Sequence, residues 1–418
     1  MTDRPHVVPW QEAWQEALYG PAGFYRRAEG PAGHFRTACH AGAGVLAGAL
    51  LRIAEEAGCR AIVDVGAGRG ELLTALAEVI AADLAEQPPD QVPAGRVLLP
   101  GVEPDGSARP DGSARPGGPA ESGEPAGTAD TGAADGDPAG RPEPTETWPL
   151  RLHGVDVVDR PAGLPAQVGW SKGLDALPDE VLDGALVVAW ELLDVIPGPI
   201  AQVQADGVRL LLVDPATGEE QVGPPLSAVE TAWCARWWPV ADAAPGSRVE
   251  LGQARDQLWS GLVHRVAATS RGGLLVAVDY AHDVAHRPPE GSLSAFRGGR
   301  PVPPVPDGSC DLTTHVALDS VAAAGERAGA TSTLQLSQRT ALRALGVVMT
   351  PADLAAASAE GAAALVAQLE IRSQMDELLD PAGLGGFGWL VQGVHRPVPA
   401  LLQEATVHHV PLRRPDDY

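Results

Sequence analysis

Residues 61–73 read Ala-Ile-Val-Asp-Val-Gly-Ala-Gly-Arg-Gly-Glu-Leu-Leu, and this stretch decides the fold. The β-branched run from Ile62 to Val65 is typical of a buried parallel strand. Three glycines at alternate positions follow it, and apolar residues with helical spacing begin after Glu71. Glycine lets a backbone turn tightly and approach a ligand closely, because it has no Cβ. A strand, a glycine turn and a helix in this order predict the first βα unit of a nucleotide-binding α/β sheet.

The spacing of the glycines limits which class of ligand the turn is expected to bind. The dinucleotide fingerprint G-x-G-x-x-G would place its third glycine where Glu71 stands, which disfavours a nicotinamide cofactor. This chain has G-x-G-x-G instead, with Gly66, Gly68 and Gly70 preceded by Asp64 at the end of the strand. That pattern resembles motif I of class I S-adenosylmethionine (SAM) methyltransferases, which implies that these four residues bind the cofactor. The alternative is a glycine-rich turn in an α/β domain of another kind.

Bulk composition excludes several classes of function. The chain has 418 residues, 44% of them hydrophobic, enough for one large or two modest domains. Its formal net charge is −24, whereas nucleic acids and anionic membranes bind basic surfaces, so neither is an expected partner. The four cysteines stand far apart without C-x-x-C spacing, so we expect neither a metal site nor a disulfide framework. No apolar run indicates a signal peptide or a membrane span, and the expected location is the cytoplasm.

A change of composition interrupts the α/β pattern between residues 104 and 147. This segment consists mainly of Gly, Pro, Ala, Ser, Asp and Glu, and contains a tandem copy of Asp-Gly-Ser-Ala-Arg-Pro that begins at Asp105. Such a segment cannot bury enough surface to offset its ordering entropy. Because the α/β pattern resumes after it, we interpret it as a disordered insertion within one domain. The predicted organisation is a cap region (1–60), a methyltransferase-like domain (61–400) and a C-terminal tail (401–418).

Two acids are candidates for holding a ribose. In nucleotide-binding sheets an acid at the end of the second strand can accept hydrogen bonds from both ribose hydroxyls. Asp156 stands near the end of the strand-like run Leu150–Val158, and Glu103 ends the earlier run Arg96–Glu103. We favour Asp156, because the chain after it reaches the next strand with ordinary short spacing. Glu103 remains the alternative.

Another pair of acids follows the apolar strand Ala185–Ala189. Carboxylates just past the carboxyl end of a parallel strand face the ligand-binding crevice. Glu191 and Asp194 are three residues apart, so one helical turn would bring both to the same side. Two carboxylates can hold a cationic guanidinium, which makes this pair the candidate catalytic residues. The alternative is a pair of acids at a helix start that interacts with the helix dipole.

The remaining pattern completes an α/β sheet with helices on both faces. We expect additional strands at 201–203 and 208–213 (an antiparallel decoration of the sheet), 273–280 and 388–393, and helices at 9–18, 41–57, 317–325 and 351–379. His282 and His315 follow strand-like runs, and a lone histidine at such a position is usually structural.

Several segments between Tyr19 and Gly393 together resemble one family, the MidA-like SAM-dependent methyltransferases. This family includes the mitochondrial complex I assembly factor that methylates an arginine of a complex I subunit. The family segments Y-G-P-x-G-F-Y, G-D-F-x-T-S, the glycine motif, N-E-F-F-D-A-L-P, D-Y-G-H, G-T-L-R and D-L-T-x-H-V are similar to Tyr19–Tyr25, Gly33–Ala38, Gly66–Gly70, Trp190–Pro197, Asp279–His282, Gly291–Ser294 and Asp311–Val316. The resemblance implies a class I SAM-methyltransferase (Rossmann-like) fold with an N-terminal helical cap and added strands and helices. It also implies SAM as cofactor and a protein arginine, or another protein or small-molecule nucleophile, as methyl acceptor.

The sequence departs from the family mainly on the acceptor side. His34 stands where the family has Asp, Ala38 where it has Ser, Trp190 where it has Asn, Ala281 where it has Gly and Ser294 where it has Arg. An indole in place of the asparagine would fill space beside the cofactor. Two functions therefore compete: a methyltransferase, and a non-catalytic SAM-binding assembly or chaperone protein that keeps the fold.

Overall fold

The computed structural model describes residues 6–27, 37–86 and 150–405. By compactness the chain divides into two units, Met1–Pro88 with Leu150–Tyr418 and Pro89–Pro149. The described residues all belong to the first unit, to which the following paragraphs refer. The predicted insertion at 104–147, the candidate Glu103 and the departure at His34 lie outside the described residues.

The first unit is built on a seven-stranded sheet with the order β16-β17-β10-β5-β2-β3-β4. Its strands, in chain order, are β2 (Ala61–Val65), β3 (Arg151–Asp156), β4 (Gly169–Lys172), β5 (Ala185–Trp190), β10 (Gly273–Asp279), β16 (Ser332–Ser337) and β17 (Gly388–Val394). All neighbouring strands pair in parallel except β17, which is antiparallel to both β10 and β16. The chain enters the sheet at β2, extends it to one side through β3 and β4, and then continues on the other side at β5. The boundary between β2 and β5 is therefore the switch point of the sheet.

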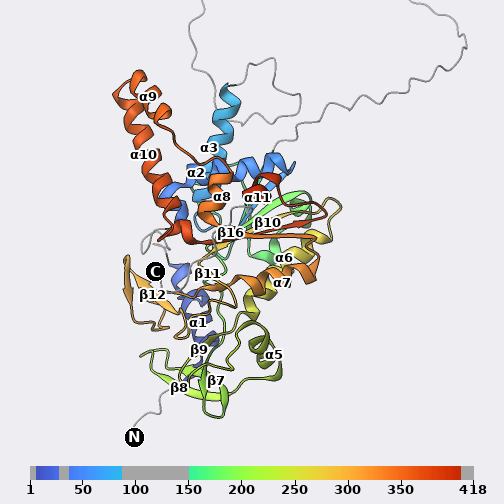
Figure 1. Ribbon diagram of the computed structural model, residues 1–418, viewed down its shortest axis with the longest axis vertical. Helices are drawn as coiled ribbons and strands as arrows, with labels where there is room; N and C mark the ends of the chain where they lie inside the picture. The colour runs from blue at the N-terminus through green and yellow to red at the C-terminus, as the bar shows by residue number, and fades with distance from the viewer. Residues whose placement is uncertain (1–5, 28–36, 87–149, 406–418) are drawn as a thin grey trace, which may run out of the picture. The chain divides into compact units, whose positions relative to one another are not determined.

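Helices cover both faces of this sheet, as the sequence predicted (Figure 1). The central strands are buried on both sides because they consist almost entirely of apolar residues; in β5, Leu186 and Val188 join the core on one face and Val187 joins the core on the other. The first face packs against α2 (Ala38–Glu56), α3 (Glu71–Glu86), α8 (Gln338–Ala344), α10 (Ala362–Leu379) and α11 (Ala400–Ala405). The second packs against α4 (Asp179–Leu182), α6 (Gln253–Ala267) and α7 (Leu318–Ala328).

A separate antiparallel sheet corrects one prediction. The strands expected at 201–203 and 208–213 do pair antiparallel, as β6 (Ile200–Gln204) and β7 (Gly207–Val213), but they do not extend the main sheet. The strand before them, β5, already has β2 and β10 as neighbours, so no edge is free beside it. They form a second sheet with β1 (Val8–Pro9), β8 (Glu220–Pro225) and β9 (Arg248–Glu250), on which α1 (Trp10–Tyr19) and α5 (Ala228–Trp237) pack.

The remaining elements are short, apart from one helical hairpin. A three-stranded sheet holds β12 (Ser294–Arg297), β13 (Arg300–Val302) and β14 (Asp311–Thr313), and β11 (Ala281–His282) pairs with β15 (Val316–Ala317). The single helix expected at 351–379 is wrong: Gly361, with φ of +128°, separates α9 (Pro351–Glu360) from α10. In the part of the chain that the structure describes, no helix has the length and apolar character needed to cross a membrane.

Candidate functional site

A cavity of about 1010 Å³ opens at the carboxyl ends of β2, β3 and β5. Its walls come from α1, the glycine turn, the segments that follow β3 and β5, and Asp311 of β14. Open α/β sheets bind their ligands at this place, where the strand order reverses. The volume is at the upper end of the range for small-molecule pockets, so a nucleoside-sized ligand would leave room for a second group beside it.

The three glycines of the turn after β2 adopt left-handed backbone conformations, with φ of +81° at Gly66, +56° at Gly68 and +80° at Gly70. A Cβ atom at Gly66 would lie 2.8 Å from Leu192 Cδ1, and one at Gly70 would lie 2.5 Å from a leucine methyl group. At Gly68 the nearest atom to such a Cβ is Glu71 Oε2, at 3.7 Å. A side chain at the first or third glycine would therefore require a leucine side chain to move, in addition to the strain of positive φ, whereas the second glycine borders open space. Gly66 and Gly68 both line the cavity.

Three acids surround this turn. Asp64 lies buried in β2, Asp156 is the last residue of β3, and Glu71 is the first residue of α3. Asp156 accepts the Gly68 N–H on Oδ2 (2.8 Å) and the Val158 N–H on Oδ1 (3.2 Å). A carboxylate has about four acceptor positions, so positions remain on Asp156 for the hydroxyls of a ligand.

The electrostatics of these acids favour a cationic ligand. Burial, the largest cause, and the neighbouring charges of Asp156 and Glu71 together raise the pKa of Asp64 to about 7. Burial also raises the pKa of Asp156, although the backbone N–H groups that it accepts oppose the shift. Like charges that repel one another at short range are stabilised by a cation placed among them. His40 near the start of α2 lies 3.7 Å from Glu71 (Nε2 to Oε1) and also lines the cavity.

Glu191 follows β5 in a left-handed conformation, with φ of +50°. Few non-glycine residues adopt it, and backbone strain of this kind concentrates at functional sites. Its Oε1 accepts the N–H of Ala38 (2.7 Å) in the first turn of α2, where the helix dipole favours an anion. Burial raises the pKa of Glu191 by more than this hydrogen bond lowers it. Together with the charges of Asp194 and Asp311, burial brings the pKa to about 8.

The helical turn expected after β5 is wrong. Residues 191–199 form bends, turns and irregular chain, because Glu191 leaves the strand with positive φ. Glu191 and Asp194 nevertheless line the same cavity. The sequence therefore predicted their proximity correctly and the local structure incorrectly.

Asp194 lies deeper than Glu191. Its Oδ2 accepts Thr313 Oγ1–H (2.8 Å), whereas its Oδ1 is buried without a partner among the described residues. Asp279, the buried last residue of β10, accepts the Leu193 N–H on Oδ2 (3.1 Å) and leaves its own Oδ1 unpaired in the same way. Burial raises the pKa of both carboxyl groups, and the contact with Asp194 raises that of Asp279 further. The two carboxyl groups lie close enough that each affects the ionisation of the other.

The buried guanidinium of Arg255 in α6 joins the two segments that carry these acids. It donates to the carbonyl oxygens of Asp194 (3.3 Å), Ile196 (3.2 Å) and His315 (3.1 Å), and to Thr314 Oγ1. Its charge also lowers the pKa of Asp194, against the larger effect of burial. Arg255 thereby fixes the segment after β5 against the segment after β14.

Sequence reasoning assigned no site role to three residues on the acceptor side. Tyr19, Tyr25 and Asp311 all line the cavity. The two tyrosine rings stack with 5.5 Å between centroids, Tyr19 Oη donates to Val195 O (3.1 Å), and Tyr25 Oη donates to Asp311 Oδ1 (2.9 Å). Burial and Asp194 raise the pKa of Asp311 to about 8. The available signal was that Tyr19–Tyr25 and Asp311–Val316 belong to the family resemblance.

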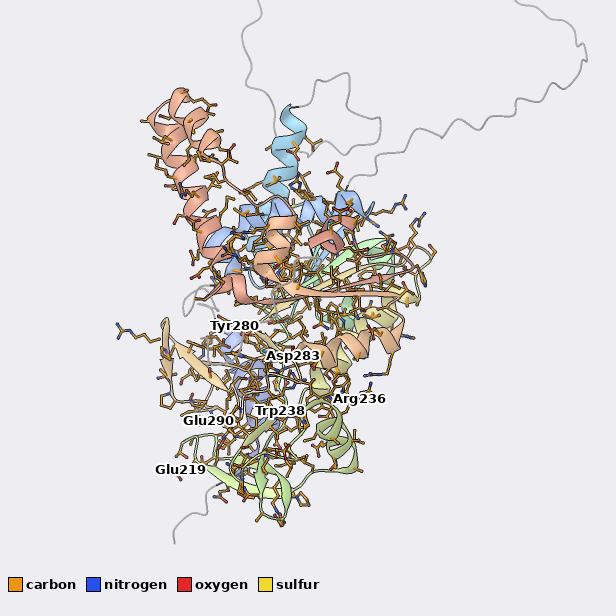
Figure 2. The ribbon with its side chains drawn as sticks, viewed as in Figure 1. Glu219, Arg236, Trp238, Tyr280, Asp283 and Glu290 are labelled. Atoms are coloured by element: carbon orange, nitrogen blue, oxygen red, sulfur yellow. The ribbon has the colours of Figure 1, made fainter. Side chains whose placement is uncertain are left out.

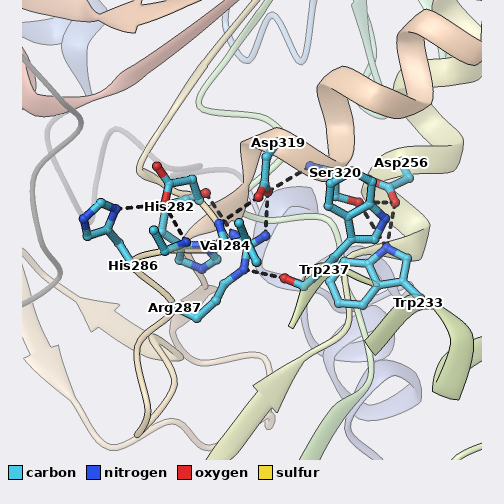
Figure 3. A network of polar contacts seen from close by, with 11 residues as sticks. Trp233, Trp237, Asp256, His282, Val284, His286, Arg287, Asp319 and Ser320 are labelled. Carbon is cyan, nitrogen blue, oxygen red and sulfur yellow. Dashed lines mark hydrogen bonds and ion pairs between the residues drawn. The ribbon is translucent and has the colours of Figure 1, made fainter. Parts of the chain in front are cut away.

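Neither His282 nor His315 is among the described residues that line this cavity. His282 is buried, its ring meets Trp238 edge-on at 5.2 Å, and its Nδ1 lies 2.6 Å from Arg287 Nη1. Figure 3 shows Arg287 joined in turn to Asp319 of α7. Burial lowers the pKa of His282 well below its usual value. His315 instead stacks on Tyr280, the residue after β10. Both histidines make contacts within the protein, and their structural role stays a prediction.

Trp190, the most prominent departure from the family, is the last residue of β5. Its ring packs edge-on against Trp389 of β17, with 5.3 Å between centroids, and the side chain is 5% exposed. It also lines the cavity. The indole thus belongs to the hydrophobic core and forms part of the cavity wall.

Most of the predicted site residues converge on one cavity; Gly70 does not line it, and Glu103 lies outside the described residues. The cavity is lined by Asp64, Gly66, Gly68, Asp156, Glu191 and Asp194. Gly70 closes the same turn through its N–H to Ala67 O (2.7 Å). Their individual roles stay predictions.

Comparison with known proteins supports the fold and the general resemblance. Residues 149–335 match the model of a family described as "putative S-adenosyl-L-methionine-dependent methyltransferase". A crystal structure of a protein from Burkholderia thailandensis, described as a "likely methyl transferase" and bound to S-adenosylhomocysteine, has a TM-score of 0.63 at 22% identity, covering 96% of this chain and 91% of that chain. An uncharacterised protein from the same organism has a TM-score of 0.62 at 22% identity, covering 94% and 90%. No match was found among curated proteins.

These similarities confirm the predicted α/β fold, a mostly parallel central sheet with helices on both faces, as that of a SAM-methyltransferase structure. The family match supports a resemblance to SAM-dependent methyltransferases in general. The narrower resemblance to the MidA-like family stays a prediction.

Proposed function

We propose that this protein is a SAM-dependent methyltransferase whose acceptor is a cation, an arginine guanidinium of a protein. The observation that carries the proposal is the continuity of one cavity. It joins the glycine turn, where a nucleoside cofactor is expected, to the buried carboxyl groups that follow β5 and begin β14.

The residues at the glycine turn fit SAM. The backbone at Gly68 leaves the space that a side chain would fill, so a ligand can approach the peptide chain there. Asp156 retains acceptor positions for the ribose hydroxyls. SAM carries positive charge on its sulfonium and its ammonium group, which suits a wall that contains Asp64 and Glu71.

The acceptor side fits a planar cation. Glu191, Asp194 and Asp311 line the cavity beside two stacked tyrosine rings. Carboxylates bind a guanidinium through charge-assisted hydrogen bonds, and aromatic faces attract it through the ring quadrupole. A cation that enters this cluster would also favour the ionised form of each carboxyl group.

Bound SAM supplies an electrophilic methyl group on a positively charged sulfur. The protein's part is to orient the acceptor nitrogen in line with that methyl group and to take the proton that the nitrogen loses as its new N–C bond forms. Glu191 is the candidate base, because it lines the cavity at the acceptor end, where a bound cation favours its ionised form.

The proposal is tested with labelled SAM and peptides that contain either one arginine or one lysine. We expect wild-type protein to label the arginine peptide, and Glu191→Gln to reduce turnover by about 10²-fold or more while it keeps its affinity for S-adenosylhomocysteine. Glu219→Gln is the matched control, because Glu219 is an exposed acid next to β8 and does not line the cavity (Figure 2). If wild type and Glu191→Gln both bind the cofactor and neither labels any acceptor, the non-catalytic alternative is correct.

A further inference from the structure

We propose that Asp311, which is oriented by Tyr25, binds the cationic acceptor together with Glu191. Spacing along the chain predicted this role for Asp194. This inference rests on the proposed function, because it concerns the acceptor end of the same cavity.

The oxygens of Asp194 are poorly placed to bind an acceptor. Its Oδ2 already accepts the Thr313 hydroxyl at 2.8 Å. Its Oδ1 is fully buried, so a ligand in the cavity cannot reach it. Asp194 therefore contributes negative charge to the cavity wall, while one of its oxygens is bound to Thr313 and the other is inaccessible.

Asp311 is as buried as Asp194, with exposures of 3% and 5%, but its carboxylate oxygens are paired differently. It begins β14, reaches the cavity from a segment far from Glu191 in sequence, and neither of its carboxylate oxygens is left buried without a partner. Tyr25 Oη donates to its Oδ1 at 2.9 Å, which orients the group and leaves further acceptor positions on the carboxylate. Asp311 is close enough to Glu191 for its charge to affect the ionisation of that residue.

The stacked tyrosine rings beside Asp311 favour one kind of cationic side chain over another. Tyr25 stacks on Tyr19 with an interplanar angle of 18°, and both rings line the cavity. Tyr19 is itself held by the hydrogen bond from its Oη to Val195 O. A planar guanidinium can lie against an aromatic face while its N–H groups reach a carboxylate at the edge, an arrangement that a compact ammonium does not match. The geometry therefore favours an arginine side chain over a lysine side chain.

The test measures acceptor binding directly, by calorimetry on protein saturated with S-adenosylhomocysteine. One peptide carries an arginine and a second carries citrulline, the neutral isostere of arginine. We expect Asp311→Asn to weaken the arginine peptide about 10- to 100-fold, the effect of one charge-assisted hydrogen bond. The citrulline peptide and S-adenosylhomocysteine should bind as they do to wild type. Asp307→Asn is the matched control, because Asp307 is an exposed acid of the preceding loop and does not line the cavity.

Unchanged affinity of Asp311→Asn for the arginine peptide overturns the inference and leaves the proposed function intact. Wild-type protein that binds S-adenosylhomocysteine but does not prefer arginine over citrulline overturns the proposed acceptor class, and this inference with it. If Asp311→Asn loses its cooperative thermal transition, Tyr25→Phe is measured in its place. A raised KM for the acceptor peptide with unchanged kcat supports the inference that Tyr25 positions Asp311 for binding. An unchanged KM overturns that inference.

Discussion

The substitution Gly68→Ala distinguishes an effect on cofactor affinity from an effect on folding stability. The added Cβ would lie 3.7 Å from its nearest neighbour, Glu71 Oε2, an ordinary van der Waals distance. The φ of +56° is the only strain, and left-handed conformation costs an L-residue about 1–2 kcal/mol. The variant should therefore fold with slightly reduced stability.

The effect on the cofactor should be larger than the effect on the fold. The methyl group would occupy space that the cavity reserves for a ligand, and overpacking by one methyl group costs roughly 1–3 kcal/mol, about 5- to 150-fold in Kd. Gly58→Ala is the matched control, because Gly58 has a similar φ of +61°, has nothing within 4 Å of its Cβ position and does not line the cavity.

The assay combines urea denaturation with calorimetric titration of S-adenosylhomocysteine. Both variants should lose the same amount of stability, and only Gly68→Ala should lose affinity. If Gly68→Ala binds S-adenosylhomocysteine as tightly as Gly58→Ala does, the cofactor does not lie against this turn, and the assignment of the glycine motif is refuted.

Three further predictions follow from the charges of the site. The pKa values of Glu191 and Asp311 are raised to about 8, against roughly 4 in the unfolded chain, so the folded state binds more protons than the unfolded state between these values and loses stability as the pH rises. Thermal melts should show a Tm that falls between about pH 5 and pH 8, and a smaller fall in Glu191→Gln; a Tm that rises over this range would contradict the burial of these acids. Asp156→Ala should weaken S-adenosylhomocysteine by about 1.5–3 kcal/mol in a calorimetric titration, and unchanged affinity would point to another ribose ligand. Arg255→Met should reduce the free energy of unfolding by about 3–5 kcal/mol in urea denaturation, because it leaves buried carbonyl groups without a donor; a loss below about 1 kcal/mol would refute its role in fixing the two segments.

The parts of the fold that the sequence predicted are those with local causes. The unit from Ala61 to the start of α3 forms as expected, because apolar periodicity and glycine spacing specify a strand, a turn and a helix within a few residues. The same holds for Asp156, which ends the strand beside β2. In α9 and α10 the local signal was also present, but the alanine-rich pattern concealed the break at Gly361.

The errors have tertiary causes. The left-handed conformation of Glu191 depends on hydrogen bonds to distant segments: its N–H donates to Val278 O (2.8 Å) and its side chain accepts the Ala38 N–H. The contact between Tyr25 and Asp311 joins residues 286 positions apart. No spacing rule along the chain reveals such a pair, so sequence reasoning named Asp194 beside Glu191 and could not single out Asp311. The role of Asp194 stays a prediction.

The most direct test of the central claim is a parallel calorimetric titration of the purified protein with S-adenosylhomocysteine and with NADH. A cavity lined by the glycine turn, Asp64 and Asp156 predicts saturable binding of one S-adenosylhomocysteine per chain and no binding of NADH. Absence of S-adenosylhomocysteine binding, or binding of NADH in its place, would contradict the account.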